Sequence, residues 1–271
     1  MRPPDHPHIA ATRPGRPVRP NAPGTSIVRK AIILSAGQGT RLLPLTENRP
    51  KCLIPVGRRT LIGWQVESLY LNGIREIVVV LGFEALKVEQ ELRRLARPGL
   101  AIRTILNPFY KLADNLGSVF LARHEMTEDF LILNGDTIFE PALLARAMQQ
   151  ASAPVTVTID RKDRYDEDDM KVQLDGLRLL DIGKTLPLDI VTGEAIGLHL
   201  FKGKGPALFS EAVLEAMRAP EGLKAFYLSV VARLARQGHV AVAPIVGLKW
   251  GEVDFPPDVE RAEALANSWT H

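Results

Sequence analysis

Residues 28–41 read Val-Arg-Lys-Ala-Ile-Ile-Leu-Ser-Ala-Gly-Gln-Gly-Thr-Arg, and Pro-Lys follows nine residues later. The aliphatic and β-branched run over residues 28–34 predicts a buried strand. After it the chain turns on Gly37 and Gly39, which exposes backbone N–H groups, and Arg41 and Lys51 add two cations. Exposed N–H groups and fixed cations at the end of a strand suit a nucleoside triphosphate.

This loop differs from two better-known phosphate-binding loops. The chain lacks Gly-x-x-x-x-Gly-Lys-Ser/Thr, and Leu42 stands where the dinucleotide fingerprint has its third glycine. A turn that only needs glycine for a positive φ is the alternative interpretation of Gly37-x-Gly39. Thr-Arg directly afterwards and the later lysine favour phosphate binding, because Arg41 can fork onto phosphate oxygens and Lys51 adds a compact charge.

Length and composition indicate a globular α/β protein. The chain has 271 residues, enough for one large domain or two small ones, and 46% of them are hydrophobic. Its single cysteine, Cys52, excludes an intramolecular disulfide and fits a reducing cytoplasm. No apolar run approaches the ~20 residues of a membrane helix, so we expect a cytoplasmic protein without membrane insertion.

The net charge of +3 lies in the N-terminal residues. Residues 1–26 hold four arginines against one aspartate, together with seven prolines, and predict a disordered Pro/Arg-rich tail. The remaining chain has 30 basic and 30 acidic residues. A neutral body argues against nucleic acid as a partner.

Periodicity and turn residues predict alternating strands and helices in residues 27–150 and a mixed arrangement in residues 151–271. Strands are expected at 28–34, 76–81, 101–106, 130–133, 155–159, 170–174, 177–182, 195–201 and 240–246. Helices are expected at 61–71 (Thr60 cap, Gly73 beyond the end), 84–96, 116–124 (Asn115 cap), 206–217, 226–237 and 257–266.

This order predicts a doubly wound, mostly parallel central sheet of Rossmann-like α/β type. An Asp175-Gly176 turn indicates an inserted β-hairpin in a mixed segment. No linker separates the two parts, so residues 27–271 are treated as one domain. Residues 27–150 are its nucleotide-binding part and residues 151–271 its acceptor-binding part.

Two carboxylate sites follow predicted strands. Asp136 comes after a strand and Gly135, where it could bind a metal or cap the next element, and the upstream glycine loop favours metal. Glu252 and Asp254 are expected on one face of a short strand. Capping of the following helix is the alternative for Asp254.

Together these segments resemble the sugar-nucleotide pyrophosphorylase superfamily, and within it the bacterial phosphocholine cytidylyltransferase-like branch. The resemblance covers about residues 28–267. It rests on the glycine loop with Pro50-Lys51 and on these segments: Asn107-Pro-Phe-Tyr110, Asp114-Asn-Leu-Gly-Ser118, Asn134-Gly-Asp136, Tyr165-Asp-Glu-Asp-Asp-Met-Lys171, Gly193-Glu-Ala-Ile-Gly197 and Glu252-Val-Asp254.

The resemblance implies transfer of CMP from CTP to a small phosphorylated alcohol or phosphonate, with release of pyrophosphate. It implies Mg²⁺ on Asp136 and Asp254, with Glu252 as a further candidate ligand. Arg41 and Lys51 would be the catalytic cations. The nucleotide site it implies consists of Ala36, Gly37, Gly39, Thr40, Arg41, Lys51, Asn115 and Ser118, where helix capping is the alternative for the last two.

The acceptor side is predicted less sharply. Lys171 and Lys184 could bind the acceptor phosphate, and Glu194 is a further candidate. The acidic run at residues 166–169 is also a candidate, with a solvated loop as the alternative. Other candidates are Asp160, Arg161 and Tyr165. Aromatic residues are only 6%, and no cluster that could form a cage for a quaternary ammonium is evident beyond Tyr165, Tyr227 and Trp250. An aminophosphonate therefore stays open beside phosphocholine.

Two other functions stay open, as does a homodimer. One is a sugar-1-phosphate thymidylyl- or uridylyltransferase of the same fold. The other is a non-catalytic nucleotide-binding protein.

Overall fold

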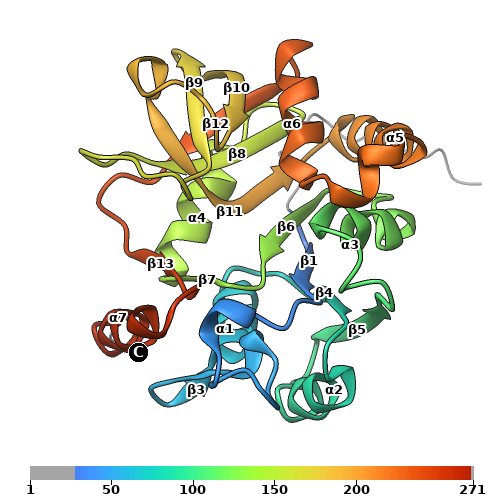
Figure 1. The fold of residues 1–271 in the computed structure, drawn as a ribbon, viewed down its shortest axis with the longest axis vertical. Coiled ribbons are helices and arrows are strands. Elements are labelled where there is room, and N and C mark those ends of the chain that lie inside the picture. Colours follow the sequence, from blue (N-terminus) through green and yellow to red (C-terminus); the bar gives the residue numbers. More distant parts are fainter. Residues whose placement is uncertain (1–27, 270–271) are drawn as a thin grey trace, which may run out of the picture.

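The computed structural model of the chain describes residues 28–269, so the predicted tail over residues 1–26 lies outside the described residues. A nine-stranded sheet runs through the middle of the molecule (Figure 1). Its strands lie side by side in the order β5 (Ala101–Leu106), β4 (Glu76–Leu81), β1 (Lys30–Ser35), β6 (Phe130–Asn134), β11 (Gly193–Phe201), β8 (Val155–Asp160), β12 (Val240–Pro244), β10 (Arg178–Gly183) and β9 (Lys171–Asp175).

The sheet is mixed rather than mostly parallel. β5, β4, β1 and β6 are parallel neighbours, as predicted, and β8 is parallel to β12. β11 is antiparallel to both β6 and β8, and the hairpin β9–β10 is antiparallel around the predicted turn at Gly176. The α/β prediction therefore holds, while the parallel arrangement is confined to the first four strands and to β8 with β12.

Helices cover both faces of the sheet, as the doubly wound prediction requires. Side chains of α1 (Leu61–Leu71), α2 (Ala85–Arg94) and α4 (Pro141–Gln150) form one core with one face of the strands. Side chains of α3 (Asn115–Leu121), α5 (Gly205–Arg218) and α6 (Tyr227–Arg236) form the core on the other face. A smaller core lies under α7 (Pro256–Asn267), where the rings of Trp64 and Trp269 meet edge to face at 5.3 Å.

Local chemistry explains the ends of α1. The Thr60 hydroxyl accepts the Gly63 N–H at 3.1 Å and caps the first turn, and Gly73 follows the last turn with φ +83°. Ile62, Val66 and Leu69 are fully buried. Each such side chain contributes roughly 1.5–3 kcal/mol by leaving water.

Two other helix starts differ from the predictions. α3 begins at Asn115 and ends at Leu121, so Asn115 is its first residue and not its cap. α7 begins at Pro256, because Phe255 is already its cap residue. Asp254 therefore precedes the cap.

A small two-stranded sheet brings two distant segments together. β7 (Thr137–Phe139) pairs antiparallel with β13 (Trp250–Glu252), with Thr137 opposite Glu252. β13 ends at Glu252, so the predicted strand does not reach Asp254, and the shared face expected from alternation does not apply. The pairing instead places Asp136, just before β7, beside the segment that follows β13.

The remaining short elements are the strand pair β2 (Pro55–Val56) and β3 (Arg59–Thr60) and single 3₁₀ turns. Within residues 28–269, no helix combines the length and the apolarity that crossing a bilayer requires.

Candidate active site

The glycine loop leaves the carboxyl end of β1 and turns back through a 3₁₀ turn at Thr40–Leu42. Gly39 has φ +79°, and a Cβ there would lie 2.9 Å from the Cβ of Lys51. Only glycine therefore lets the loop approach Lys51 this closely. The Thr46 hydroxyl donates to the Gly39 carbonyl at 2.7 Å and holds the loop in place.

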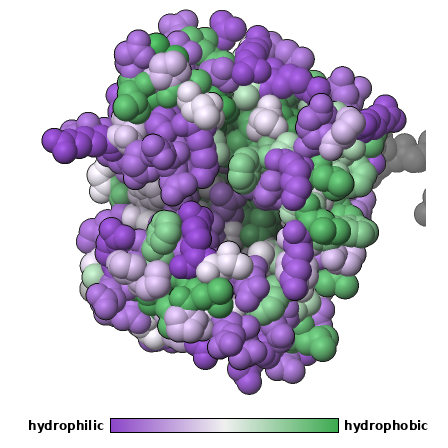
Figure 2. Space-filling view, viewed as in Figure 1, coloured by the Kyte–Doolittle hydropathy of each residue, from purple (hydrophilic) through white to green (hydrophobic). Residues whose placement is uncertain are grey.

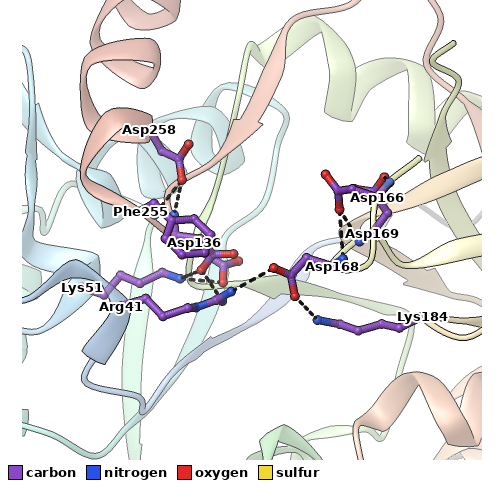
Figure 3. A network of polar contacts seen from close by, with 10 residues as sticks. Arg41, Lys51, Asp136, Asp166, Asp168, Asp169, Lys184, Phe255 and Asp258 are labelled. Carbon is purple, nitrogen blue, oxygen red and sulfur yellow. Dashed lines mark hydrogen bonds and ion pairs between the residues drawn. The ribbon is translucent and has the colours of Figure 1, made fainter. Parts of the chain in front are cut away.

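Four predicted site residues meet in one network of ion pairs (Figure 3). The Lys51 ammonium lies 3.0 Å from Asp136 Oδ2 and 2.6 Å from Asp254 Oδ1. Arg41 Nη2 binds the same oxygen of Asp254 at 2.9 Å. Residues separated by up to 213 positions in the sequence thus form one charged cluster.

The helix-capping alternatives do not describe these carboxylates. β7, not a helix, follows Asp136. At α7, the backbone N–H groups of Asp254 and Phe255 both donate to Asp258 Oδ2, at 2.9 and 2.7 Å. Asp258 therefore satisfies the start of the helix, and the side chain of Asp254 is directed to Arg41 and Lys51.

The cluster shifts the pKa values of its members in opposite directions. Burial opposes protonation of Lys51, but the carboxylates of Asp136 and Asp254 outweigh it and raise the pKa of the ammonium. Burial likewise opposes ionisation of Asp136, but Lys51 outweighs it and lowers the pKa of that carboxyl. Lys51 and Asp136 are therefore both charged at neutral pH.

Glu252 behaves differently because it has no cation of its own. Its side chain lines a cavity next to the cluster. Desolvation by the surrounding protein nevertheless raises its pKa to about 8. The charges of Asp136 and Asp254 add to this rise. The Glu252 carboxyl is therefore mostly protonated at neutral pH, in contrast to that of Asp136.

Two cavities meet at this cluster. The loop cavity has a volume of about 560 Å³ and is lined by Gly37, Gln38, Gly39, Thr40, Arg41, Lys51, Tyr110, Lys111 and Asp254. The central cavity, of about 590 Å³, continues on the other side, and Arg41 and Asp254 line it too. Figure 2 shows the molecule hollowed in its middle, below the part that carries β9 and β10 in Figure 1.

A third, smaller space gathers the residues predicted to meet the base. This side cavity of about 260 Å³ is lined by Leu34, Ala36, Gly37, Tyr110, Ala113, Asp114, Asn115, Ser118 and Phe226. Asn115 accepts the Tyr227 N–H through its side-chain oxygen at 2.8 Å, which ties α3 to the start of α6. The Ser118 hydroxyl accepts from Asn107 Nδ2 at 3.0 Å.

The predicted acceptor residues are only partly brought together. Lys184 and Glu194 line the central cavity, and burial raises the pKa of Glu194 to about 7 although Lys162 lies 2.8 Å away. Lys171 is buried and does not line it. Its ammonium donates to the carbonyl of Lys184 at 2.9 Å, so it supports the loop rather than facing the cavity.

The acidic loop at residues 166–169 is largely exposed, as expected of a solvated run, but hydrogen bonds within it define its turn. The Asp166 carboxylate accepts the backbone N–H groups of Asp168 and Asp169, at 2.9 and 3.2 Å. This turn places the Asp168 carboxylate 3.8 Å from Arg41 and 3.2 Å from Lys184, across the central cavity (Figure 3). Apart from the motif carried by the resemblance, no pattern in the sequence predicts this contact.

Sequence reasoning found only part of the aromatic lining of the site. Phe226, Trp250 and Phe255 come from three different elements and line the central cavity together. Tyr110 lines both the loop cavity and the side cavity. Trp250 had been noted among the few aromatic residues, and Tyr110 only as part of the Asn107–Tyr110 segment, without a role. Phe226 and Phe255 were missed, because residues so far apart in sequence leave no local pattern.

Cys52 provides a simple test of the packing beside Lys51. It is 3% exposed, and burial raises the pKa of its thiol to about 12. Because the thiolate is the reactive form, we expect the folded protein to react with a disulfide reagent such as DTNB at pH 8 at least about a hundredfold more slowly than free cysteine does. Unfolding in guanidinium should release one thiol, and rapid labelling of the folded protein would contradict this burial.

Comparison with known proteins fits this geometry. Residues 30–169 match the protein family described as nucleotidyl transferase. A CMP-5'-(3-aminopropyl)phosphonate synthase of Streptomyces rubellomurinus is 31% identical over 252 residues, covering 86% of this chain and 38% of the relative. A choline-phosphate cytidylyltransferase of Streptococcus pneumoniae is 34% identical over 111 residues, covering 41% of this chain and 46% of the relative.

The chain thus spans less than half the length of these two relatives. The fold also matches solved structures over most of their length. The inositol-1-phosphate CTP transferase from T. maritima superimposes with a TM-score of 0.75 at 22% identity, covering 91% of this chain and 99% of that one. The match to the family extends over more than half of the sequence and confirms the resemblance drawn from the glycine loop: the chain belongs to the nucleotidyl transferase family.

Proposed function

We propose that the chain is a Mg²⁺-dependent cytidylyltransferase that transfers CMP from CTP to a small phosphorylated alcohol or phosphonate and releases pyrophosphate. One observation carries the proposal. Arg41 and Asp254 line both the loop cavity and the central cavity, and Lys51 binds Asp254 at this boundary. Group transfer requires donor and acceptor to meet at one point, and this boundary supplies it.

The residues at the boundary suit an in-line displacement. An oxygen of the acceptor attacks the α-phosphorus of CTP, the bond from that phosphorus to the bridging oxygen breaks, and the electron pair leaves with pyrophosphate. Lys51 and Arg41 would bind the triphosphate and balance the charge that develops on it. An acceptor that is already anionic needs no base, and the cluster contains no nucleophile for a covalent intermediate.

The chemistry of the cluster fits a divalent cation. Asp136 and Asp254 bind the same ammonium, so their oxygens lie close enough to share one ion. Desolvation, and after it the charges of Asp136 and Asp254, raise the pKa of Glu252, so a cation bound beside these carboxylates would favour the ionised form of Glu252. Mg²⁺ is usually bound by one or two carboxylates together with substrate phosphates, and these two aspartates with a bound triphosphate would supply that set. When bound, Mg²⁺ would neutralise the α-phosphate.

The central cavity supports an acceptor with a positive end. Its acidic lining residues outnumber the basic ones, which are Arg41, Lys184 and Arg261. Lys184 and Arg41 already lie over Phe226 and Phe255, at 5.9 and 5.0 Å from the ring centres, so these rings can accept a cation. An acceptor that carries an amine or a quaternary ammonium beside its phosphate or phosphonate fits this wall.

The choice of CTP is supported by relatives rather than by base contacts. Both relatives described above are named for CMP or cytidylyl transfer, and one name specifies an aminopropylphosphonate product. The side cavity adjoins the glycine loop through Gly37 and has room for a pyrimidine ring. We propose that Ala36, Asn115 and Ser118 meet the base there.

A pyrophosphate-release assay tests the proposal. CTP, UTP, dTTP and ATP are each combined with phosphocholine, 2-aminoethylphosphonate and glucose 1-phosphate. We expect kcat/KM for CTP with an amine-bearing acceptor to exceed every other pair by at least about tenfold, because each 1.4 kcal/mol of selective binding gives that factor. A matched acceptor, 2-hydroxyethylphosphonate, measures the contribution of the amine.

Two outcomes would overturn the proposal. Turnover of UTP or dTTP with glucose 1-phosphate would assign a sugar-1-phosphate nucleotidyltransferase. Binding of nucleotides in calorimetry without product from any pair would assign a non-catalytic binding protein.

A further inference from the structure

Gln65 lies in the middle of α1 and is 1% exposed. Its side-chain nitrogen donates to two backbone carbonyls, those of Asn134 and Thr137, at 2.8 Å each. These carbonyls flank Gly135 and Asp136. One carboxamide thus bridges both ends of the loop that carries a carboxylate of the site.

The loop is also held from its other sides. The Gly135 N–H donates to the Leu34 carbonyl at 2.9 Å, and a Cβ on Gly135 would lie only 2.5 Å from that oxygen. The Asp136 carbonyl accepts the Val253 N–H at 3.1 Å, so the position of Asp136 also sets the segment that leads to Asp254. Gln65 supplies the contacts on the α1 side.

The hydrogen bonds of Gln65 are asymmetric. An amide NH₂ group has two N–H donors, and both are used here. The side-chain oxygen of Gln65 is buried and has no hydrogen-bond partner among the described residues. Burying a polar atom without a partner costs about 1–3 kcal/mol, which an apolar side chain of similar size would avoid. The donors therefore account for a glutamine at this position better than packing does.

We infer that Gln65 is a positioning residue that fixes the loop 134–137 and thereby aims the Asp136 carboxylate at Lys51 and Asp254. It lines none of the three cavities and acts through Asp136. The inference rests on the proposed function, because it assigns Asp136 to the reaction centre. Misplacing a catalytic group by about 1 Å can cost on the order of a hundredfold in rate.

Gln65→Met removes both donors and keeps the length and helix propensity of the side chain. We expect kcat to fall about 10- to 100-fold and the Mg²⁺ concentration for half-maximal rate to rise several-fold, while KM for the acceptor changes by less than about threefold. Ser68→Ala is the matched control. Ser68 lies one turn later on α1, is equally buried, and donates to the Phe139 carbonyl at 3.3 Å, beyond the loop.

Hydrogen exchange gives a second readout that does not depend on turnover. In Gln65→Met, backbone amides of residues 134–137 should exchange at least about tenfold faster than in the wild type, because the two hydrogen bonds from Gln65 no longer oppose local opening. Ser68→Ala should leave them unchanged. Gln65→Leu replaces Gln65→Met if the latter does not fold.

The outcomes separate the two proposals. If the wild type turns over no substrate pair, the proposed function is wrong. The exchange rates then still test whether Gln65 fixes the loop 134–137. An active wild type whose Gln65→Met variant matches Ser68→Ala in kcat, Mg²⁺ dependence and exchange overturns the role of Gln65.

Discussion

Asp254→Asn is expected to lower kcat at least about a hundredfold, which is typical for loss of one fixed charge that stabilises a transition state. The asparagine keeps the shape of the side chain but loses the charge that binds Lys51 at 2.6 Å and Arg41 at 2.9 Å. If Asp254 also binds Mg²⁺, the substitution removes one of its two carboxylate ligands. The rate with saturating CTP, acceptor and Mg²⁺ measures the effect.

The fold should tolerate this change. The start of α7 is satisfied by Asp258, which accepts the N–H groups of Asp254 and Phe255, and neither bond involves the Asp254 side chain. We therefore expect the melting temperature to shift by no more than about 2 °C, which corresponds to less than about 1 kcal/mol in a chain of this size.

Asp181→Asn is a matched control for the loss of one carboxylate. Asp181 binds the guanidinium of Arg236 at 2.9 Å, the same distance as Asp254 to Arg41, but it lies on β10 outside the three cavities. Its substitution should leave kcat within about twofold of the wild-type value, because Asp181 lies outside the site. The loss of stability should also be small, since exposed ion pairs contribute at most about 1 kcal/mol to folding. A large stability loss in Asp254→Asn with near-normal turnover would contradict the assignment of Asp254 to the reaction centre.

The sequence predicted the elements of this fold well where local signals are complete. The helix Leu61–Leu71 has the predicted bounds, because a hydroxyl cap, an apolar stripe and a terminal glycine all mark it. The strands Glu76–Leu81 and Ala101–Leu106 also have the predicted bounds. Each of these features acts over a few residues and can therefore be recognised in the chain itself.

The direction of a strand is not a local property. β11 is buried along all nine residues and was recognised as a strand, but its sequence does not show that it runs antiparallel between β6 and β8. That orientation depends on the connection through the hairpin β9–β10. The expectation of a mostly parallel sheet failed for this reason.

The residues of the candidate site also fall into those that local sequence predicts and those that it does not. The glycine loop, Lys51 and Asp136 were recognised from residues next to them, and the structure brings them together. Gln65 was not recognised, because a glutamine in a helix usually lies at the surface. Asp168 was named only as part of the acidic run, because an acidic loop is usually solvated. Arg41 lies 127 residues from Asp168 in the sequence, and the carbonyl partners of Gln65 lie 69 and 72 residues from it, so only the folded chain reveals these contacts.

Lys51→Met is expected to reduce kcat by about a thousandfold or more, comparable with removal of other cations that stabilise a transferring phosphoryl group. Lys51 is the only lysine or arginine among the described residues that binds both Asp136 and Asp254. Its side chain is 14% exposed and its pKa is raised by these carboxylates, so it is charged throughout the neutral range. The rate is measured with the substrate pair that the wild type prefers.

The same variant tests whether Lys51 and Mg²⁺ share one pair of carboxylates. Without the ammonium, Asp136 and Asp254 face each other with less positive charge between them, which should cost about 1–3 kcal/mol of stability. Millimolar Mg²⁺ without nucleotide should restore part of this loss, because an ion that binds only the folded state stabilises it. The melting temperature should therefore rise more with Mg²⁺ in Lys51→Met than in the wild type, where the ammonium already occupies the space.

Lys87→Met controls for the loss of one positive charge. Lys87 lies on α2, pairs with Glu84 at 3.0 Å and is 46% exposed, so its loss should change neither turnover nor the response to Mg²⁺. Equal stabilisation of wild type and Lys51→Met by Mg²⁺ would show that the metal binds elsewhere. A larger rise in melting temperature with Mg²⁺ in Lys51→Met than in the wild type means that the Lys51 ammonium occupies the site of the ion in the protein without Mg²⁺. The lysine would then be released toward the triphosphate only when Mg²⁺ and CTP arrive together, which couples binding of the donor to assembly of the reaction centre.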